Sequence, residues 1–89
     1  MRAVITVIGH DTVGIIARVS AYCKEKEINI LDISQSILSD FFCMIMLVDL
    51  SKSTAAFSET VDAMNAIGRE MNLSIHTMHE DIFNSMHKI

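Results

Sequence analysis

The residues whose types and spacing suggest chemistry lie together in one short loop, Gly9-His10-Asp11-Thr12-Val13-Gly14-Ile15. Asp11 or Thr12 can cap a helix that follows, because either side-chain oxygen can accept a hydrogen bond from a free amide at a helix start. A helix start also presents unpaired amides and the positive end of the helix dipole, which suit a ligand carboxylate. Gly14 has no β-carbon, so a ligand can approach the backbone there.

A ligand that carries both charges would find partners for both. The Asp11 carboxylate can accept a hydrogen bond from an α-ammonium group, and the Asn29 amide, which follows the first predicted helix, can bond either group. Simpler roles account for the same residues: Asp11 as a helix cap, Asn29 as a turn residue and His10 as an exposed loop side chain. The residues alone leave these alternatives open.

Other candidate chemistry is weaker. His76 and His79 point to opposite faces of a predicted strand, so a zinc site that joins them with His87 is not expected. Cys23 and Cys43 lie in separate apolar segments without Cys-x-x-Cys spacing, which favours buried, reduced thiols. No serine or cysteine stands in a nucleophile setting, and the glycine-containing loop lacks the lysine of a phosphate-binding loop. We therefore expect no catalytic residue, no metal and no cofactor.

Composition limits the function further. The 89 residues are enough for one domain, and 51% of them are hydrophobic, which is more apolar surface than a small domain hides alone. Self-association is therefore expected. The net charge is −4 and the seven basic residues are scattered, so nucleic-acid binding is disfavoured. The first apolar run stops at Gly9, too short for a signal peptide or a membrane span, so we predict a cytoplasmic protein that does not bind membranes.

Hydrophobic periodicity predicts the elements that position the loop. Residues 3–8 form an inner strand, residues 13–27 an amphipathic helix, and residues 28–38 an edge strand with a phase change at Leu31. The continuously apolar run from Phe41 to Leu50 predicts an inner strand covered on both faces. A second helix extends from about Phe57 to Met71, followed by a strand at 73–78 and a short amphipathic helix at 81–89.

This order, β-α-β-β-α-β plus a helix, predicts an α+β fold: a ferredoxin-like two-layer sandwich with an antiparallel sheet and an extra C-terminal helix. Residues 1–89 form a single domain with its core in 1–80 and the amphipathic helix in 81–89. Right-handed crossovers place the first and third strands in the centre and both long helices on one face. The other face of the central strands is apolar, and we expect the terminal helix and a second subunit each to cover part of it.

The segment VIGHDTVGII at 7–16, followed by INILDISQ at 28–35, resembles ACT domains. It is most similar to stand-alone single-ACT proteins and to each half of the two-domain glycine-cleavage regulator, and the resemblance covers residues 1 to about 80. It implies a regulatory module that binds a small ligand, often an amino acid, between two paired domains. The first loop of one subunit and the start of the second strand of its neighbour typically form the pocket. Carried over by position, the ligand-binding residues are His10, Asp11, Thr12, Val13, Gly14 and Ile15 of the loop, with Asn29 and Ile30 of the strand.

Two functions follow as hypotheses. The first is a homodimer or higher homo-oligomer that senses an amino acid or a related small molecule and acts on a protein effector in trans, since a stand-alone ACT domain has no attached enzyme. The second is a ligand-free structural or protein-interaction module in which the loop stays empty. An enzyme is not expected.

Overall fold

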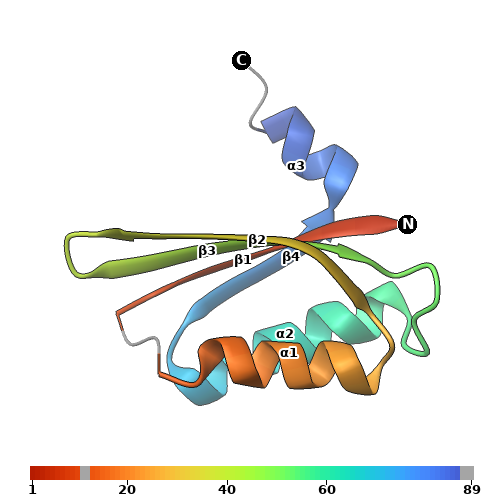
Figure 1. Ribbon diagram of the computed structural model, residues 1–89, viewed down its shortest axis with the longest axis horizontal. Coiled ribbons are helices and arrows are strands. Elements are labelled where there is room, and N and C mark those ends of the chain that lie inside the picture. The colour runs from red at the N-terminus through yellow and green to blue at the C-terminus, as the bar shows by residue number, and fades with distance from the viewer. Residues whose placement is uncertain (11–12, 87–89) are drawn as a thin grey trace.

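A computed structural model describes residues 1–10 and 13–86, and it has the predicted ferredoxin-like order (Figure 1). The elements are β1 (Arg2–Gly9), α1 (Ile15–Glu25), β2 (Asn29–Leu38), β3 (Phe41–Asp49), α2 (Phe57–Met71), β4 (Ser74–His79) and α3 (Glu80–Met86). The four strands pair in the order β2-β3-β1-β4, and every pairing is antiparallel. The first and third strands are therefore central, as the crossover rule predicts.

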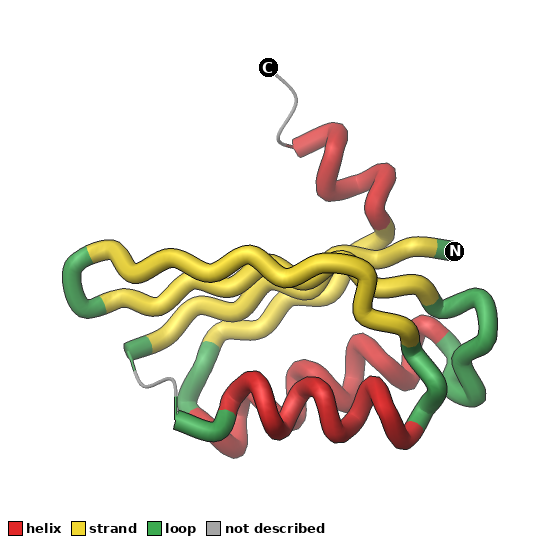
Figure 2. Tube along the Cα trace, viewed as in Figure 1, coloured by secondary structure: helices red, strands yellow, loops and turns green. Residues whose placement is uncertain are grey.

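The core lies between the sheet and the two long helices, which both cover the same sheet face (Figure 2). Alternate residues of the central strands point into it, because side chains of a strand alternate between faces. Its fully or almost fully buried members include Ile5 and Val7 of β1, Met44, Met46 and Val48 of β3, Val19 and Cys23 of α1, and Met64 and Ile67 of α2. Methionine supplies several of these contacts, consistent with its use as an adaptable core residue.

The edge strand β2 is irregular where the hydrophobic pattern changes phase. Its register against β3 shifts between Ile30 and Asp32, so Leu31 forms a β-bulge, which was not predicted but accounts for the phase change. Beyond the bulge Ile33 and Ile37 lie on the helix-covered face, and Ser34 and its alternate neighbours lie on the other.

The prediction that β3 is covered on both faces is wrong for the single chain. Burial alternates along it: Met44 and Met46 are buried, whereas Ile45 between them is 42% exposed. The reason is topological, because both long helices lie on one side of the sheet. The short α3 packs against β1 and β4 on the other side, so its described residues cover part of that face, as expected, while Ile45 of β3 stays exposed.

Three helix boundaries differ from the predicted ones. α1 begins at Ile15, with Gly14 as its N-cap residue, rather than at Val13 after a cap at Asp11 or Thr12. Asp11 and Thr12 themselves lie outside the described residues. The helix ends at Glu25 rather than Glu27, because Glu27 adopts a left-handed conformation with φ 57°. The terminal helix begins one residue early, at Glu80, and residues 87–89 lie outside the description.

Candidate functional site

The loop that carries the sequence motif lies at the end of β1, next to the start of α1. His10 is exposed there, and its ring is stacked obliquely on Phe41 with 4.5 Å between the ring centres. Val13 is 83% exposed, whereas the side chain of Ile15 is completely buried in the core. Ile15 can therefore offer a ligand only its backbone, while His10 and Val13 can offer side chains.

Gly14 connects this loop to α1 and is the N-cap residue of the helix. It has φ 81° and ψ −5°, a left-handed conformation that side chains disfavour, and its carbonyl accepts the hydrogen bond from the Arg18 amide at 2.9 Å. The amides of Ile15, Ile16 and Ala17 precede this first helical bond, so they lie at the N-terminal end of α1. This end of the helix can hold a carboxylate.

The conformation of Gly14 gives a first prediction. Gly14→Ala should lower the free energy of unfolding by about 1–2 kcal/mol, because an L-residue is strained in the left-handed region. The added β-carbon would come no closer than 4.0 Å to Met71, so the cost is conformational and not steric. Gly14→Asn is the matched control, since asparagine tolerates this conformation better. Urea denaturation of both variants should show alanine as the more costly substitution, and an equal or smaller cost for alanine would contradict the assignment.

An open cleft of about 560 Å³ adjoins the loop on the side of β4. Ile8, Gly9 and His10 line one wall, and the end of α2 with the start of β4 lines the other. The second wall adds three polar side chains that sequence reasoning missed, namely Arg69, Asn72 and Ser74. They lie about 60 residues from the loop in sequence, and only the antiparallel pairing of β1 with β4 brings them beside it.

The close packing of this region depends on two glycines that contact Leu73. A β-carbon on Gly9 would overlap the end of the Leu73 side chain, and one on Gly68 would lie 2.8 Å from the Leu73 carbonyl oxygen. Gly68 also accepts the hydrogen bond of the Leu73 amide at 2.8 Å, which closes the end of α2. These contacts fix the distance between the loop and the second wall of the cleft.

The strand half of the predicted site lies elsewhere in the chain. Asn29 begins β2 at the far end of α1 from the loop (Figure 1), where it is exposed and pairs in register with Asp49. It lines a small cavity of about 270 Å³ with Glu27, Asp49, Ser51 and Lys52. Ile30 is partly buried against the core. Within one chain, therefore, the loop and Asn29 do not come together.

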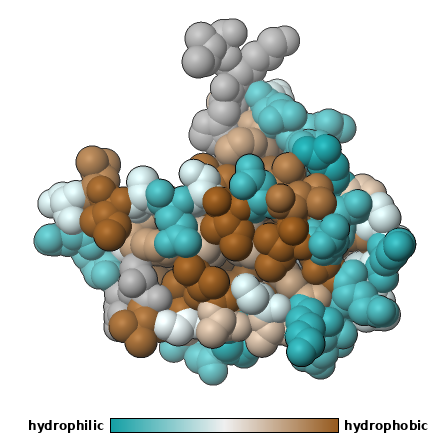
Figure 3. Space-filling view, in the orientation of Figure 1, coloured by the Kyte–Doolittle hydropathy of each residue, from teal (hydrophilic) through white to brown (hydrophobic). Residues whose placement is uncertain are grey.

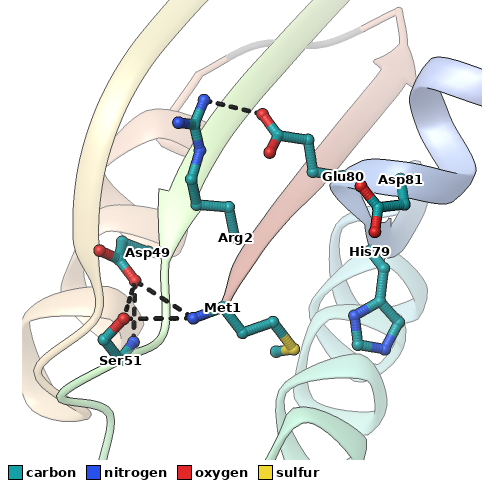
Figure 4. Close-up of a pocket in the computed structure, with 7 residues that line it drawn as sticks. All are labelled: Met1, Arg2, Asp49, Ser51, His79, Glu80 and Asp81. Atoms are coloured by element: carbon teal, nitrogen blue, oxygen red, sulfur yellow. Dashed lines mark hydrogen bonds and ion pairs between the residues drawn. The ribbon is translucent and has the colours of Figure 1, made fainter.

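A second polar cavity, of about 320 Å³, surrounds the N-terminus (Figure 4). The Met1 ammonium group lies 3.8 Å from the Asp49 carboxylate and donates to the Ser51 hydroxyl at 3.2 Å, and Arg2 pairs with Glu80 at 2.7 Å. These charges are paired with one another, so their evident role is to hold β1 against the end of β3 and the start of α3.

Asp49 connects these pairs. The Ser51 hydroxyl and amide donate to its carboxylate at 2.6 and 2.9 Å, and these hydrogen bonds, helped by the charges of the N-terminus and Arg2, hold the pKa of Asp49 below its ordinary 3.8. A carboxyl group with a lowered pKa stabilises the fold above its unfolded pKa, and the contribution is lost as the pH falls through the folded value.

The lowered pKa of Asp49 therefore predicts how the stability of the protein depends on pH. Asp49→Asn should flatten the acid limb of the stability profile, so that the melting temperature falls less between neutral pH and the region below 3.8 than it does in the parent protein. Asp40→Asn, in the exposed β2–β3 turn, is the control and should keep the parental profile. Circular dichroism melts across this range measure it, and parallel profiles for Asp49→Asn and the parent would contradict the role of Asp49.

The remaining candidates stay apart from one another. His76 lies on the open sheet face, whereas His79 stacks on Phe57 of α2, with 4.1 Å between ring centres, on the helix-covered face. Among the described residues no group of three or more His, Cys, Asp or Glu side chains is placed to hold a metal ion, and His87 lies outside them. Burial raises the pKa of the Cys23 thiol to about 11, while Cys43 on the open face is partly exposed. In the part of the chain described, no helix is long and apolar enough to cross a membrane.

Comparison with known proteins agrees with this architecture. The model of the ACT domain family matches residues 2–77. The UPF0237 protein of Listeria innocua is 47% identical over 89 residues, which is the whole of both chains. An ACT domain protein from Streptococcus pneumoniae has a solved structure that superposes with a TM-score of 0.80, at 37% identity and with 93% of each chain covered.

The chain is also similar in structure to a protein of the kind that the sequence resembles, a regulator of glycine cleavage. The structure of a putative glycine cleavage system transcriptional repressor superposes with a TM-score of 0.66 over 85% of this chain and 43% of that one. Its identity of 23% shows a shared fold and no more. Together, the family match across nearly the whole chain, the full-length relative and the observed βαββαβ order show that this chain belongs to the ACT domain family.

Proposed function

We propose that this protein is a small-molecule sensor that works as a homodimer and binds an amino acid or a related metabolite between its subunits. The observation that carries the proposal is the position of the two predicted half-sites. The Gly9–Ile15 loop and Asn29 lie at opposite ends of α1, so one chain cannot bring them together. A two-fold axis beside the middle of β2 and α1 would do so twice.

The side of the molecule that such an axis requires is free and apolar. β2 is an edge strand, so one row of its backbone groups is available for pairing with a second chain. Figure 3 looks onto this side and shows apolar side chains grouped along the sheet edge and the helix below it. The exposed apolar residues of β2 and α1 include Ile16 and Leu31, which are 39% and 44% exposed. A patch of this kind indicates an interaction surface.

Antiparallel pairing of β2 with β2 of a partner would extend the four-stranded sheet to eight strands. The start of one β2 then lies beside the end of the other. In Figure 1 the hairpin end of β2 and the start of α1 point toward the same end of the molecule. The partner's Asn29 and the partner's Ile30 would therefore lie close to the Gly9–Ile15 loop.

The chemistry of the combined site suits a zwitterion. The amides at the start of α1 would hold the ligand carboxylate, Asp11 would accept from its ammonium group, and the partner's Asn29 could bond either group. None of these groups forms a nucleophile–base pair, so the proposed role is binding and not catalysis. The ligand would change the stability or geometry of the dimer, and a protein effector in trans would detect the change.

A protein-interaction role is the second candidate, and one observation favours it. The tip of the β2–β3 hairpin exposes Ile37, Leu38 and Phe41 by 77%, 72% and 45%. Large apolar side chains at the end of a projecting hairpin suit contact with another protein. In this case the loop would stay empty, and no small molecule would stabilise the fold.

A thermal-shift screen with the standard amino acids and related metabolites separates the two candidates. A ligand present at a hundredfold excess over its Kd stabilises the folded state by about 2.7 kcal/mol. For a domain of this size the melting temperature should then rise by roughly 10–20 °C. The rise should disappear in Asp11→Ala and in Asn29→Ala and persist in Asn65→Ala, an exposed asparagine of α2. No response to any compound, with a partner protein recovered by pull-down, would favour the interaction role.

A further inference from the structure

We propose that a second copy of this chain docks on the open face of the sheet, opposite α1 and α2, with each copy seating its α3 in a groove of the other. This contact is separate from the β2 edge used in the proposed function, so the two together would give a tetramer. It does not depend on a small-molecule ligand.

The groove lies between the open face of the sheet and α3, and its volume is about 490 Å³. Ile8 and Ile45 of the central strands form part of its floor with Met78 of β4, while Phe83 and Met86 of α3 form its wall. Its lining is almost entirely apolar and contains no acidic or basic side chain other than the ring of His76. A groove of this chemistry calls for an apolar occupant, since burying an unpaired charge there would be costly.

The apolar segment that we expect to fill the groove is the α3 helix of a second copy. The helix projects away from the sheet (Figure 1), and its described residues pack against their own chain mainly along β1 and β4. Ile82 and Met86 remain 51% and 66% exposed, and Phe83 is half-buried. A seven-residue helix is too short to be stable alone, so its order depends on packing, and its own chain supplies only part of that packing.

The groove and α3 lie next to each other on the same chain, so each of two copies can offer its helix to the groove of the other. A two-fold axis between two such chains would place each α3 in the groove of the other, as a closed dimer requires. The centre of the open face is apolar, whereas Asp32, Ser34 and Ser36 of β2 form a polar border on the same face. An apolar centre with a polar rim is the usual make-up of a protein interface.

The exposed apolar area is sufficient for such a contact. Half-exposed side chains of this size leave on the order of 100 Å² each in water. Five of them lie on the open face (Ile8, Phe41 and Ile45) or belong to α3 (Ile82 and Met86), which gives roughly 500 Å² per chain and 1,000 Å² per pair, about what a specific interface needs.

Light scattering after size-exclusion chromatography tests the proposal on the full chain. The parent protein should have the mass of four chains at micromolar concentration. Ile45→Lys on the sheet and Met86→Lys on α3 should each halve that mass, because each places a charge in the open-face contact. Ala66→Lys, on the exposed side of α2, is the matched control and should leave the mass unchanged. Circular dichroism establishes that each variant is folded.

A variant of the β2 side separates this proposal from the proposed function. Ile16→Lys should also halve the mass, and combined with Ile45→Lys it should give a monomer. If Ile45→Lys and Met86→Lys leave the mass unchanged while Ile16→Lys halves it, the open-face contact is disproved and the β2 dimer stands. If only the open-face variants lower the mass, the β2 dimer fails instead. A parent protein that is monomeric would overturn both.

Cys43 provides a second readout, because it lies in the groove beside Ile45. In the assembly its thiol should alkylate slowly with iodoacetamide, and Ile45→Lys should speed the reaction at least several-fold. The buried Cys23 should stay unmodified in both proteins and serves as an internal control. Equal rates at Cys43 in the parent and the variant, measured by mass spectrometry, would count against the contact.

Discussion

Ile5→Ala should lower the free energy of unfolding by about 3–4 kcal/mol, among the largest effects expected for a single substitution in this chain. Ile5 is completely buried at the centre of the sheet, where β1 pairs with Met46 of β3 on one side and Thr77 of β4 on the other. The substitution removes apolar contacts and leaves a cavity that the paired strands cannot close. Since proteins are commonly stable by only about 5–15 kcal/mol, this loss is a large fraction of the total stability.

Urea denaturation followed by circular dichroism measures this cost, with all proteins at one concentration because self-association adds to apparent stability. Leu38→Ala is the control: it also truncates a large aliphatic side chain, but one that is 72% exposed at the hairpin tip. Its effect should be within about 0.5 kcal/mol. Similar costs for the two variants would show that the sheet–helix layer is not the stabilising core.

Gly68→Ala should also be costly, at about 1–3 kcal/mol, even though alanine is the better helix former. The added β-carbon would lie 2.8 Å from the Leu73 carbonyl oxygen and 3.4 Å from the Ile75 side chain. A backbone oxygen cannot turn aside as a side chain can, so α2 would have to move away from β4. That movement would also widen the cleft beside the loop.

Asn65→Ala, on the exposed side of the same helix, is the matched control and should be neutral or slightly stabilising. Thermal and urea denaturation of both variants give the comparison. If Gly68→Ala proves as stable as the parent or more so, helix propensity outweighs the close approach, and the packing of α2 on β4 is looser than described.

Most of the fold could be predicted from local pattern. Alternation in β2 indicates an edge strand, and β-branched residues in β1 indicate an inner strand, and both are found. The phase change at Leu31 marks the place of the β-bulge, but the pattern alone does not predict one. The exposure of Ile45 could not be predicted, because a continuously apolar strand looks the same whether its second face is covered by its own chain, by a partner or by neither. The sequence predicts a start of α1 that is too early, because Asp11 and Thr12 have side chains that can cap a helix, whereas no local signal indicates a left-handed Gly14.

The candidate site was predictable only in part. The loop that contains His10 and Gly14 is contiguous, so residue types and spacing reveal it. Arg69 and Asn72 belong to the end of α2, and no local signal connects them with the loop. Their proximity follows from strand pairing and from the close contact between Gly68 and Leu73, which are properties of the folded chain.

The most direct test of a site shared between subunits is to mix two variants that have each lost ligand binding. In a dimer whose sites each take the loop of one subunit and the β2 start of the other, Asp11→Ala and Asn29→Ala each damage both sites. A mixed dimer of the two variants has one site with both changes and one intact site. After the variants are unfolded together and refolded, calorimetric titration with the ligand found in the thermal-shift screen should recover binding at the parental affinity with one site per mixed dimer. Binding that stays absent from folded mixed dimers would contradict a site shared between subunits.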